Sequence, residues 1–348
     1  MSQLVTTPKS HYLPAADVHY AWDVDNDPTL VIDPGDTVVV WTRDVSDNQV
    51  GLVSDASVLA NLDWDRTYPL TGPIAVSGAE PGDTLKVEVL DMHTQGWGWT
   101  GVIPGSGLLP DDFPDPYLRI FDLTAGDVAY FREDIPIPLA PYFGTMGVCP
   151  AGAHGQSIVP PGTFGGNVDI RQLVRGSTLY LPVQVDEALF SCGDAHAAQG
   201  DGEVCVTAIE SPMFGALRFT LEKGRSILAP QFSTPARLTL RVDSTPYYGT
   251  TGVNGDLYAA AQDAVRAMIE HVVTRYELTP KDAYLLTSLA VDLRISEIVN
   301  AGQYVVSALL PEAIFSTGER RAQGQKSQGR HPTMDAPHLV TSTFPTFA

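Results

Sequence analysis

A glycine-led turn that runs into an apolar strand recurs along the first half of the chain. Residues 29–42 read TLVIDPGDTVVVWT, and residues 79–91 read AEPGDTLKVEVLD. In the second segment apolar residues alternate with mostly polar ones, which is typical of a strand with one buried face. A weaker third instance, VRGSTLYLPVQV, spans residues 174–185. The repetition predicts a mainly β fold, a β-sandwich or barrel built from repeated hairpins.

Helical patterns come late in the chain. Residues 256–276 place apolar side chains at helical spacing. A second helix is predicted from Thr279-Pro280 to about Val291, because threonine caps helices and proline suits the first turn. A third, short helix is predicted near Ile295–Asn300. Residues 96–117 are rich in glycine and proline, so we expect a long ordered loop there.

These patterns suggest an order of domains. The chain has 348 residues, enough for one large domain or for two to three interlocked ones. We expect an N-terminal β domain over 1–140 and a second β region over 141–255. A C-terminal α+β or helical portion follows over 256–316, and a mobile or oligomer-wrapping tail over 317–348.

The net charge and the cysteine content indicate which binding partners and which cellular compartment to expect. The net charge is −20, with 41 acidic and 21 basic residues, so neither nucleic acid nor a membrane is an expected partner. The excess of acidic residues indicates either a soluble surface or a site where carboxylates bind a cation. The net charge alone does not distinguish these two interpretations. The odd cysteine count, without a CxxC pair, argues against disulfides and finger-type zinc sites. With no basic, apolar leader, the cytoplasm is the expected location.

The segment GDAHAAQGDGEV, residues 193–204, is the densest cluster of reactive side chains. Asp194 and His196 offer the oxygen and nitrogen ligands that suit Zn²⁺, Mn²⁺ or Fe²⁺. A bound ion would activate a water and polarise a carbonyl, and Glu203 or Glu210 could pass a proton to a leaving amine. A solvated surface turn and a calcium-binding turn are the alternatives, although calcium prefers oxygen to histidine.

Two further segments carry candidate site residues. Gly165 and Gly166 allow close backbone approach, and Asn167 and Asp169 can hydrogen-bond an amide; a tight turn explains them equally well. Asp44 follows a predicted strand, where it could bind a metal or only form a turn. The motifs for a phosphate loop and a serine nucleophile elbow do not occur.

The chain resembles the acetamidase/formamidase family. The resemblance rests on residues 71–91, 144–151, 160–183 and 188–210, with a later piece, AVDLRISEIVN, at 290–300. It implies hydrolysis of formamide, acetamide or a similar short amide to ammonia and a carboxylate, through a metal-bound water. It also implies a mostly β fold with an α+β portion and a cytoplasmic homo-oligomer.

The resemblance and the cluster chemistry together assign roles. The expected cofactor is a divalent metal, zinc first, with manganese, iron or calcium as alternatives. The backbone amides near Gly165 and Gly166 are expected to hold the oxyanion. A non-catalytic metal- or solute-binding β protein is the alternative function. The assigned residues are Asp194, His196 and Asp44 as metal ligands, Glu203, Glu210 and Asp201 as catalytic groups, and Gly165, Gly166, Asn167 and Asp169 as substrate-binding groups.

Overall fold

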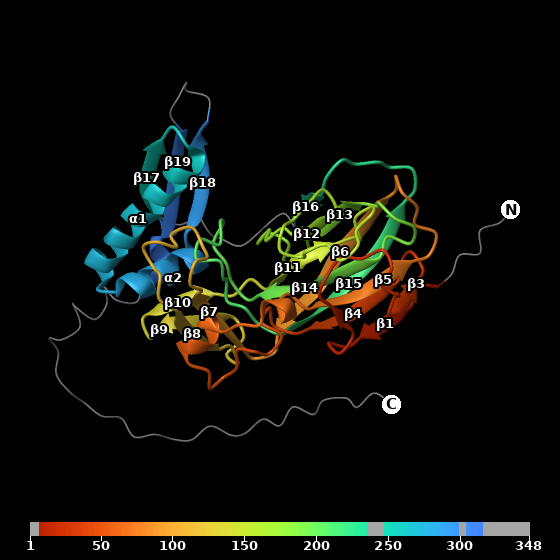
Figure 1. The fold of residues 1–348 in the computed structure, drawn as a ribbon, viewed down its shortest axis with the longest axis horizontal. Coiled ribbons are helices and arrows are strands. Elements are labelled where there is room, and N and C mark those ends of the chain that lie inside the picture. The colour runs from red at the N-terminus through yellow and green to blue at the C-terminus, as the bar shows by residue number, and fades with distance from the viewer. Residues whose placement is uncertain (1–6, 235–246, 299–303, 316–348) are drawn as a thin grey trace, which may run out of the picture.

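The molecule combines a β-sandwich with a smaller α+β lobe beside it (Figure 1). The computed structural model describes residues 7–234, 247–298 and 304–315. Within these ranges most regular structure is strand, and both α-helices follow residue 255. The predicted mainly β class with a C-terminal α+β portion is therefore confirmed.

Two six-stranded sheets form the sandwich. The first contains, in spatial order, β1 (Ser10–Leu13), β4 (Thr37–Thr42), β15 (Met213–Glu222), β6 (Thr84–Thr94), β13 (Thr178–Pro182) and β16 (Gln231–Ser233). The second contains β12 (Gly165–Asn167), β11 (Tyr142–Gly147), β14 (Phe190–His196), β5 (Leu70–Val76) and β2 (Val18–His19), with β3 (Leu30–Ile32) parallel to β5.

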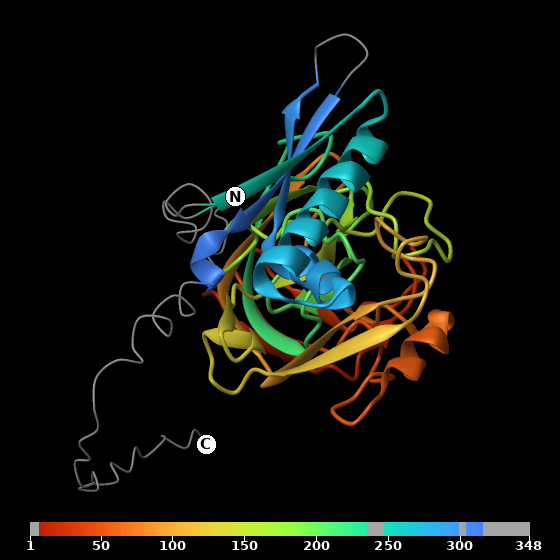
Figure 2. The ribbon, with the colours of Figure 1, turned by 90° about the vertical axis from the view of Figure 1, so that its left-hand side faces the viewer.

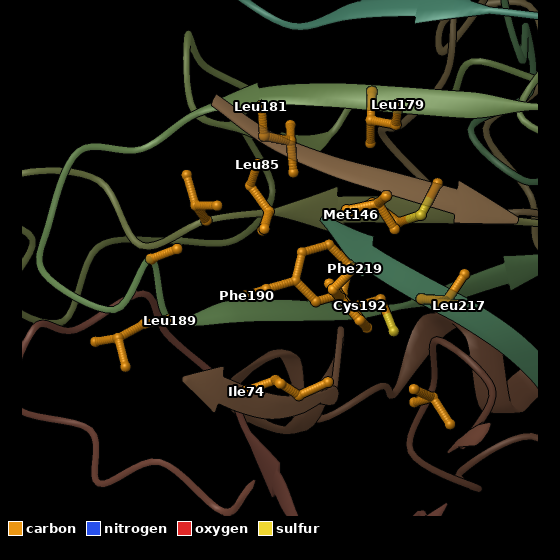
Figure 3. Close-up of a cluster of buried hydrophobic side chains, with 14 of the residues drawn as sticks. Ile74, Leu85, Met146, Leu179, Leu181, Leu189, Phe190, Cys192, Leu217 and Phe219 are labelled. Atoms are coloured by element: carbon orange, nitrogen blue, oxygen red, sulfur yellow. The ribbon is translucent and has the colours of Figure 1, made fainter. Parts of the chain in front are cut away.

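The main hydrophobic core fills the space between these sheets (Figure 3). Phe190 and Cys192 come from the second sheet, and Leu85 and Phe219 from the first. Full burial of an aliphatic or aromatic side chain stabilises the fold by about 1.5–3 kcal/mol. β14 is buried at every position, so polar groups at its end lie inside the protein.

The α+β lobe is built around a three-stranded sheet that α1 crosses on one face (Figure 2). Thr279 caps α2 with Pro280 in its first turn, as predicted, and Asp256 caps α1. Its elements are β17 (Tyr247–Asn254), β19 (Tyr304–Pro311) and β18 (Asp292–Glu297), α1 (Leu257–Tyr276), α2 (Pro280–Ala290), the pairs β7 (Trp97–Val102) with β8 (Tyr117–Asp122) and β9 (Val128–Arg132) with β10 (Ile135–Pro138), and the 3₁₀ turn η3 (Glu312–Phe315).

One buried acid ties α2 to strand β8. Arg119 of β8 forms an ion pair with Asp282 of α2, and Tyr117 Oη donates to the same carboxylate. Burial by itself would raise the pKa of Asp282, but Arg119 and the hydrogen bonds from Thr279 and Tyr117 bring that pKa below its ordinary value. Asp282 is therefore held in its charged form.

Two local predictions were wrong. Residues 292–297 form strand β18 and not a helix, because they pair with β19; residues 299–300 lie outside the described residues. Residues 97–102 form strand β7 and not a loop. Its glycines permit close packing, since a Cβ on Gly98 would lie 2.7 Å from the carbonyl oxygen of Glu210. Long-range pairing therefore overrode the local signals.

Residues 29–42, the first of the predicted turn and strand units, do not form a hairpin. Strands β3 and β4 lie in different sheets, so the Pro34-Gly35-Asp36 turn carries the chain from one layer to the other. Strands from both sides of residue 140 share each sheet, and the predicted domain boundaries stay a prediction. The predicted tail 317–348 lies outside the described residues. Neither described helix is long and apolar enough to cross a membrane.

Candidate functional site

The site forms where the buried strand β14 ends, on the side of the sandwich that faces the α+β lobe (Figure 1). Asp194 and His196 occupy this end of β14. A backbone bridge pairs His196 with Glu210, and another pairs Glu210 with Trp99 of β7. The site therefore joins the second sheet to the β7–β8 hairpin.

Four carboxyl groups surround the imidazole of His196. Its Nε2 lies 3.3 Å from Asp194 Oδ1, 3.3 Å from Glu210 Oε2 and 3.8 Å from Glu203 Oε1. Its Nδ1 lies 3.8 Å from Asp169 Oδ1. Two overlapping groups have the spacing of metal ligands, namely Asp194, His196, Glu210 and Asp169, His196, Glu203.

Two carboxylate oxygens of this cluster are buried without a hydrogen-bond donor among the described residues. They are Glu210 Oε2 and Asp169 Oδ1. A buried acceptor without a donor is costly, and several buried carboxylates repel one another. Protons or a bound cation must therefore compensate this charge, and the oxygen and nitrogen donors fit a divalent transition ion.

Hydrogen bonds behind the imidazole determine which nitrogen faces the acids. Gln199 Nε2 donates to the carbonyl oxygen of Asp169, which leaves Gln199 Oε1 as an acceptor. Tyr142 Oη donates to Gln199 Oε1, and His196 Nδ1 lies 2.9 Å from that same oxygen. Nδ1 therefore carries the proton, and Nε2 points at the carboxylates. This is how second-shell groups orient a ligating histidine.

Burial and mutual charge shift the acidities of the cluster. Burial and the charge of Asp194 raise the pKa of Asp169 to about 8. Burial and Asp169 raise the pKa of Glu203 well above its ordinary value, and burial also raises that of Glu210. Burial lowers the pKa of His196, but Glu210, Tyr142 and Asp194 outweigh it and raise the pKa well above its usual value.

A cavity of about 150 Å³ opens onto the cluster. Asp194, Glu203 and Glu210 supply its acidic wall. The other walls are mostly apolar, with Val45, Leu62, Trp64, Trp99, Ile103, Val159 and Val206 among the lining residues. Drug-sized pockets occupy about 300–1,000 Å³, so this cavity suits a much smaller molecule.

The backbone around the cavity adopts a conformation that favours glycine. The φ angles are +47° at Asp169, +49° at Asp194 and +42° at Glu203, and they are also positive at Tyr68 and Val206. Non-glycine residues with positive φ are uncommon and carry strain. Their concentration around one cavity is typical of functional sites.

Residues 6–153 and 151–317 match the model of the acetamidase/formamidase family. Among curated proteins, the acetamidase of Mycolicibacterium smegmatis is 31% identical over 268 residues, which cover 59% of this chain and 66% of that protein. The formamidase of Methylophilus methylotrophus is 29% identical over 245 residues, covering 54% and 59%. The match thus spans less than two thirds of either relative.

The chain belongs to the acetamidase/formamidase family. A solved γ-lactamase from Delftia acidovorans has the same fold, with a TM-score of 0.81 and 26% identity over 86% of this chain and 89% of that one. The family resemblance stated from the sequence segments is thereby confirmed.

In this family member, two of the predicted site residues lie apart from the ligand groups. Asp201 pairs with Arg171, Nε to Oδ1 2.9 Å, and accepts from Gln172. Asp44 accepts hydrogen bonds from Ser46 and from Trp99 Nε1. Both acids therefore brace neighbouring segments, which favours supporting roles; their predicted catalytic and metal-binding roles stay predictions.

The predicted substrate-binding glycines serve the sheet. A Cβ on Gly165 would lie 2.6 Å from the carbonyl oxygen of Met146, and the Gly165 N–H donates to Gly162. Asn167 accepts from Thr145 Oγ1 and donates to Val159. None of these groups lines the cavity described above, and their predicted roles stay predictions.

Sequence reasoning missed Tyr68, Tyr142 and Gly144. Tyr142 and Gly144 enter the site through β11, which pairs with β14. Gly144 belongs to the GTMGVCPA segment, whose match to the family was its only signal. Tyr68 had no local signal, because only the packing of β5 beside β14 brings it to the cavity.

Proposed function

We propose that this protein hydrolyses the C–N bond of a small carboxamide, releasing a carboxylate and ammonia. The observation that carries the proposal is a buried cluster of acids around one imidazole, three of whose acids line a cavity of about 150 Å³. A cavity of about this size admits a molecule as large as benzene. Formamide, acetamide and propionamide all fall within that limit, and a peptide segment does not.

A divalent ion, zinc first, would be held by Asp194, His196 and Glu210. The support is their spacing, the orphaned Glu210 Oε2 and the inward-facing His196 Nε2. When bound, such an ion supplies Lewis-acid activation of water and of a carbonyl. Gln199 and Tyr142 keep the imidazole turned toward the acids.

Glu203 is the proposed proton carrier of the reaction. Its carboxyl group lines the cavity and lies within 3.8 Å of His196 Nε2. One of its oxygens would take a proton from the attacking water while the new C–O bond forms. The same proton would then pass to the amide nitrogen as the C–N bond breaks, so that ammonia leaves uncharged.

The residues that line the cavity indicate which amides could bind there. The apolar walls around Trp64 and Trp99 suit a short alkyl group, while the acids face the reacting centre. The solved γ-lactamase of similar fold is named for a cyclic amide. A small five-membered lactam is therefore the second substrate class to test beside linear amides.

The test combines turnover with metal analysis. Ammonia release from formamide, acetamide and propionamide is measured before and after chelation, with ring opening of 2-pyrrolidinone in parallel, and bound metal is quantified. We expect turnover of at least one amide, lost on chelation and restored by zinc. Turnover that survives complete metal removal would contradict the metal proposal, and no turnover of any amide would contradict the amidase proposal.

Two histidine variants test where the metal binds. His196→Ala should lose both metal and turnover. His93→Ala is the control, because the His93 side chain is 51% exposed and belongs to no group of possible metal ligands among the described residues; its metal content should not change. Tight metal binding without turnover of any amide would favour the non-catalytic binding protein instead.

The assembly and the location that the resemblance implies are also proposals. We expect a homo-oligomer in sedimentation experiments and a cytoplasmic protein in cell fractionation. A monomer at all concentrations, or recovery in another compartment, would contradict them.

A further inference from the structure

Tyr68 lies beside the acidic wall of the cavity because of strand pairing. β5 and β14 are antiparallel, with Cys192 opposite Thr71. Residues just before β5 therefore lie next to the end of β14. The contact is close, since a Cβ on Gly193 would lie 2.7 Å from the carbonyl oxygen of Pro69.

The backbone of Tyr68, a residue that lines the cavity, is held in an unfavourable conformation. Its φ is +56°, which is an outlier for a bulky residue. Its N–H donates to the carbonyl oxygen of Val45 at 2.8 Å, which helps to hold this conformation. Strain of this kind persists where the surrounding structure enforces it, and it gathers at ligand sites.

The hydroxyl of Tyr68 makes no hydrogen bond with any residue in the described ranges, although the side chain lines the cavity. A tyrosine hydroxyl within a protein usually has a partner. The hydroxyls of Ser46 and Thr207 at this wall are already engaged, since Ser46 donates to Asp44 and Thr207 to Gly101. Tyr68 therefore keeps a donor available for a ligand.

The chemistry of the reaction needs such a donor. The acidic wall consists of hydrogen-bond acceptors, which suit an amide N–H or a cation but repel a carbonyl oxygen. Negative charge develops on that oxygen as water adds, and a preorganised donor stabilises it. The glycine amide at Gly165, predicted for this task, already donates to Gly162.

We propose that the Tyr68 hydroxyl donates a hydrogen bond to the carbonyl oxygen of the bound amide and to the oxyanion that forms from it. This inference rests on the proposed amidase function and adds a catalytic residue to it. Burial and the charges of Asp194, Glu203 and Glu210 raise the pKa of Tyr68 well above its ordinary value, so the phenol keeps its proton.

The test compares acetamide with thioacetamide in the full-length protein and in Tyr68→Phe. Sulfur accepts hydrogen bonds weakly, so removing the hydroxyl should matter less for the thioamide. Loss of an oxyanion donor typically lowers kcat by about 10²–10³-fold. We expect kcat/KM for acetamide to fall about 100-fold, mainly in kcat, and kcat/KM for thioacetamide to fall several-fold less. Tyr130→Phe, at an exposed position of β9, should leave both unchanged.

Three results would overturn the inference. The first is an equal loss for both substrates, and the second is no loss for either. The third is a lower thermal midpoint in Tyr68→Phe, because it would mean that the hydroxyl supports the fold.

A binding measurement keeps this inference separate from the proposed function. Trp64 and Trp99 line the same cavity, so ligand entry should change tryptophan fluorescence. If the wild type hydrolyses none of the amides tested for the proposed function, the amidase proposal fails, but the titration still decides on Tyr68. A selective loss of acetamide binding in Tyr68→Phe supports the donor, and a parallel change for both ligands refutes it.

Discussion

Gly144→Ala tests how closely β11 must approach the site. An added Cβ would lie 2.5 Å from Asp169 Oδ1, 2.7 Å from the carbonyl oxygen of Asp194 and 2.8 Å from His196 Cε1. Ordinary contact begins at 3.4 Å, which exceeds these distances by 0.9, 0.7 and 0.6 Å. The Asp194 oxygen belongs to the backbone of β14, so it can retreat only if the strand moves.

The magnitude follows from this crowding. Overpacking of a filled interior costs about 1–3 kcal/mol, and each kcal/mol lowers the thermal midpoint by roughly 2–4 °C in a larger domain. A displacement near 1 Å in a catalytic arrangement lowers activity by about 10²-fold. We therefore expect Gly144→Ala to lower the midpoint by several degrees and kcat/KM for a short amide by about two orders of magnitude.

Thermal unfolding, turnover and metal content are measured together. Gly51→Ala is the matched control, because no atom lies within 4 Å of the Cβ that it would add. That variant should behave as the wild type does. Wild-type stability and turnover in Gly144→Ala would refute the close packing of β11 against Asp169 and His196.

Three further predictions concern the groups around the site and the α+β lobe. Gln199→Leu removes the acceptor that holds the site histidine and should weaken zinc binding by about 10–100-fold, measured by competition with a chelator. Arg171→Leu removes the guanidinium that pairs with Asp292, a carboxylate that is 1% exposed. The free energy of unfolding should therefore fall by about 3 kcal/mol, and an unchanged urea midpoint would contradict this. The pKa of Asp282 is depressed in the folded state, so its stabilising effect is complete above an aspartate's ordinary pKa of 3.8 and is lost as pH falls through the lower folded value. Asp282→Asn should therefore flatten the acid limb of the stability curve, and an unaltered limb would count against the Arg119 pair.

The sequence predicted secondary structure correctly where the conformation depends on a few neighbouring residues. The spacing of apolar residues defined α1 nearly to its ends, and Thr279-Pro280 located the start of α2. The alternation within residues 84–89 matched the buried face of β6. These features depend on backbone preference and on burial of one face, which short stretches encode.

The same signals failed where the conformation depended on a pairing partner outside the segment itself. Residues 292–297 became a strand because β19 lies beside them, and residues 97–102 became a strand opposite β8. Asp194 and His196 were found because they stand two residues apart. Asp169 was also singled out, but its contact with His196 depends on β11 crossing between them.

By itself, the sequence determined the mainly β class, the two helices, the family and the acidic cluster on which the proposed chemistry depends. Only the tertiary structure decided which acids meet around His196, which of them brace other segments, and that Tyr68 faces the same cavity. The physical reason is that helix caps and strand alternation are encoded within a few residues, whereas the meeting of side chains depends on strand register and sheet packing between separate segments, more than a hundred residues apart for Tyr68 and Asp194.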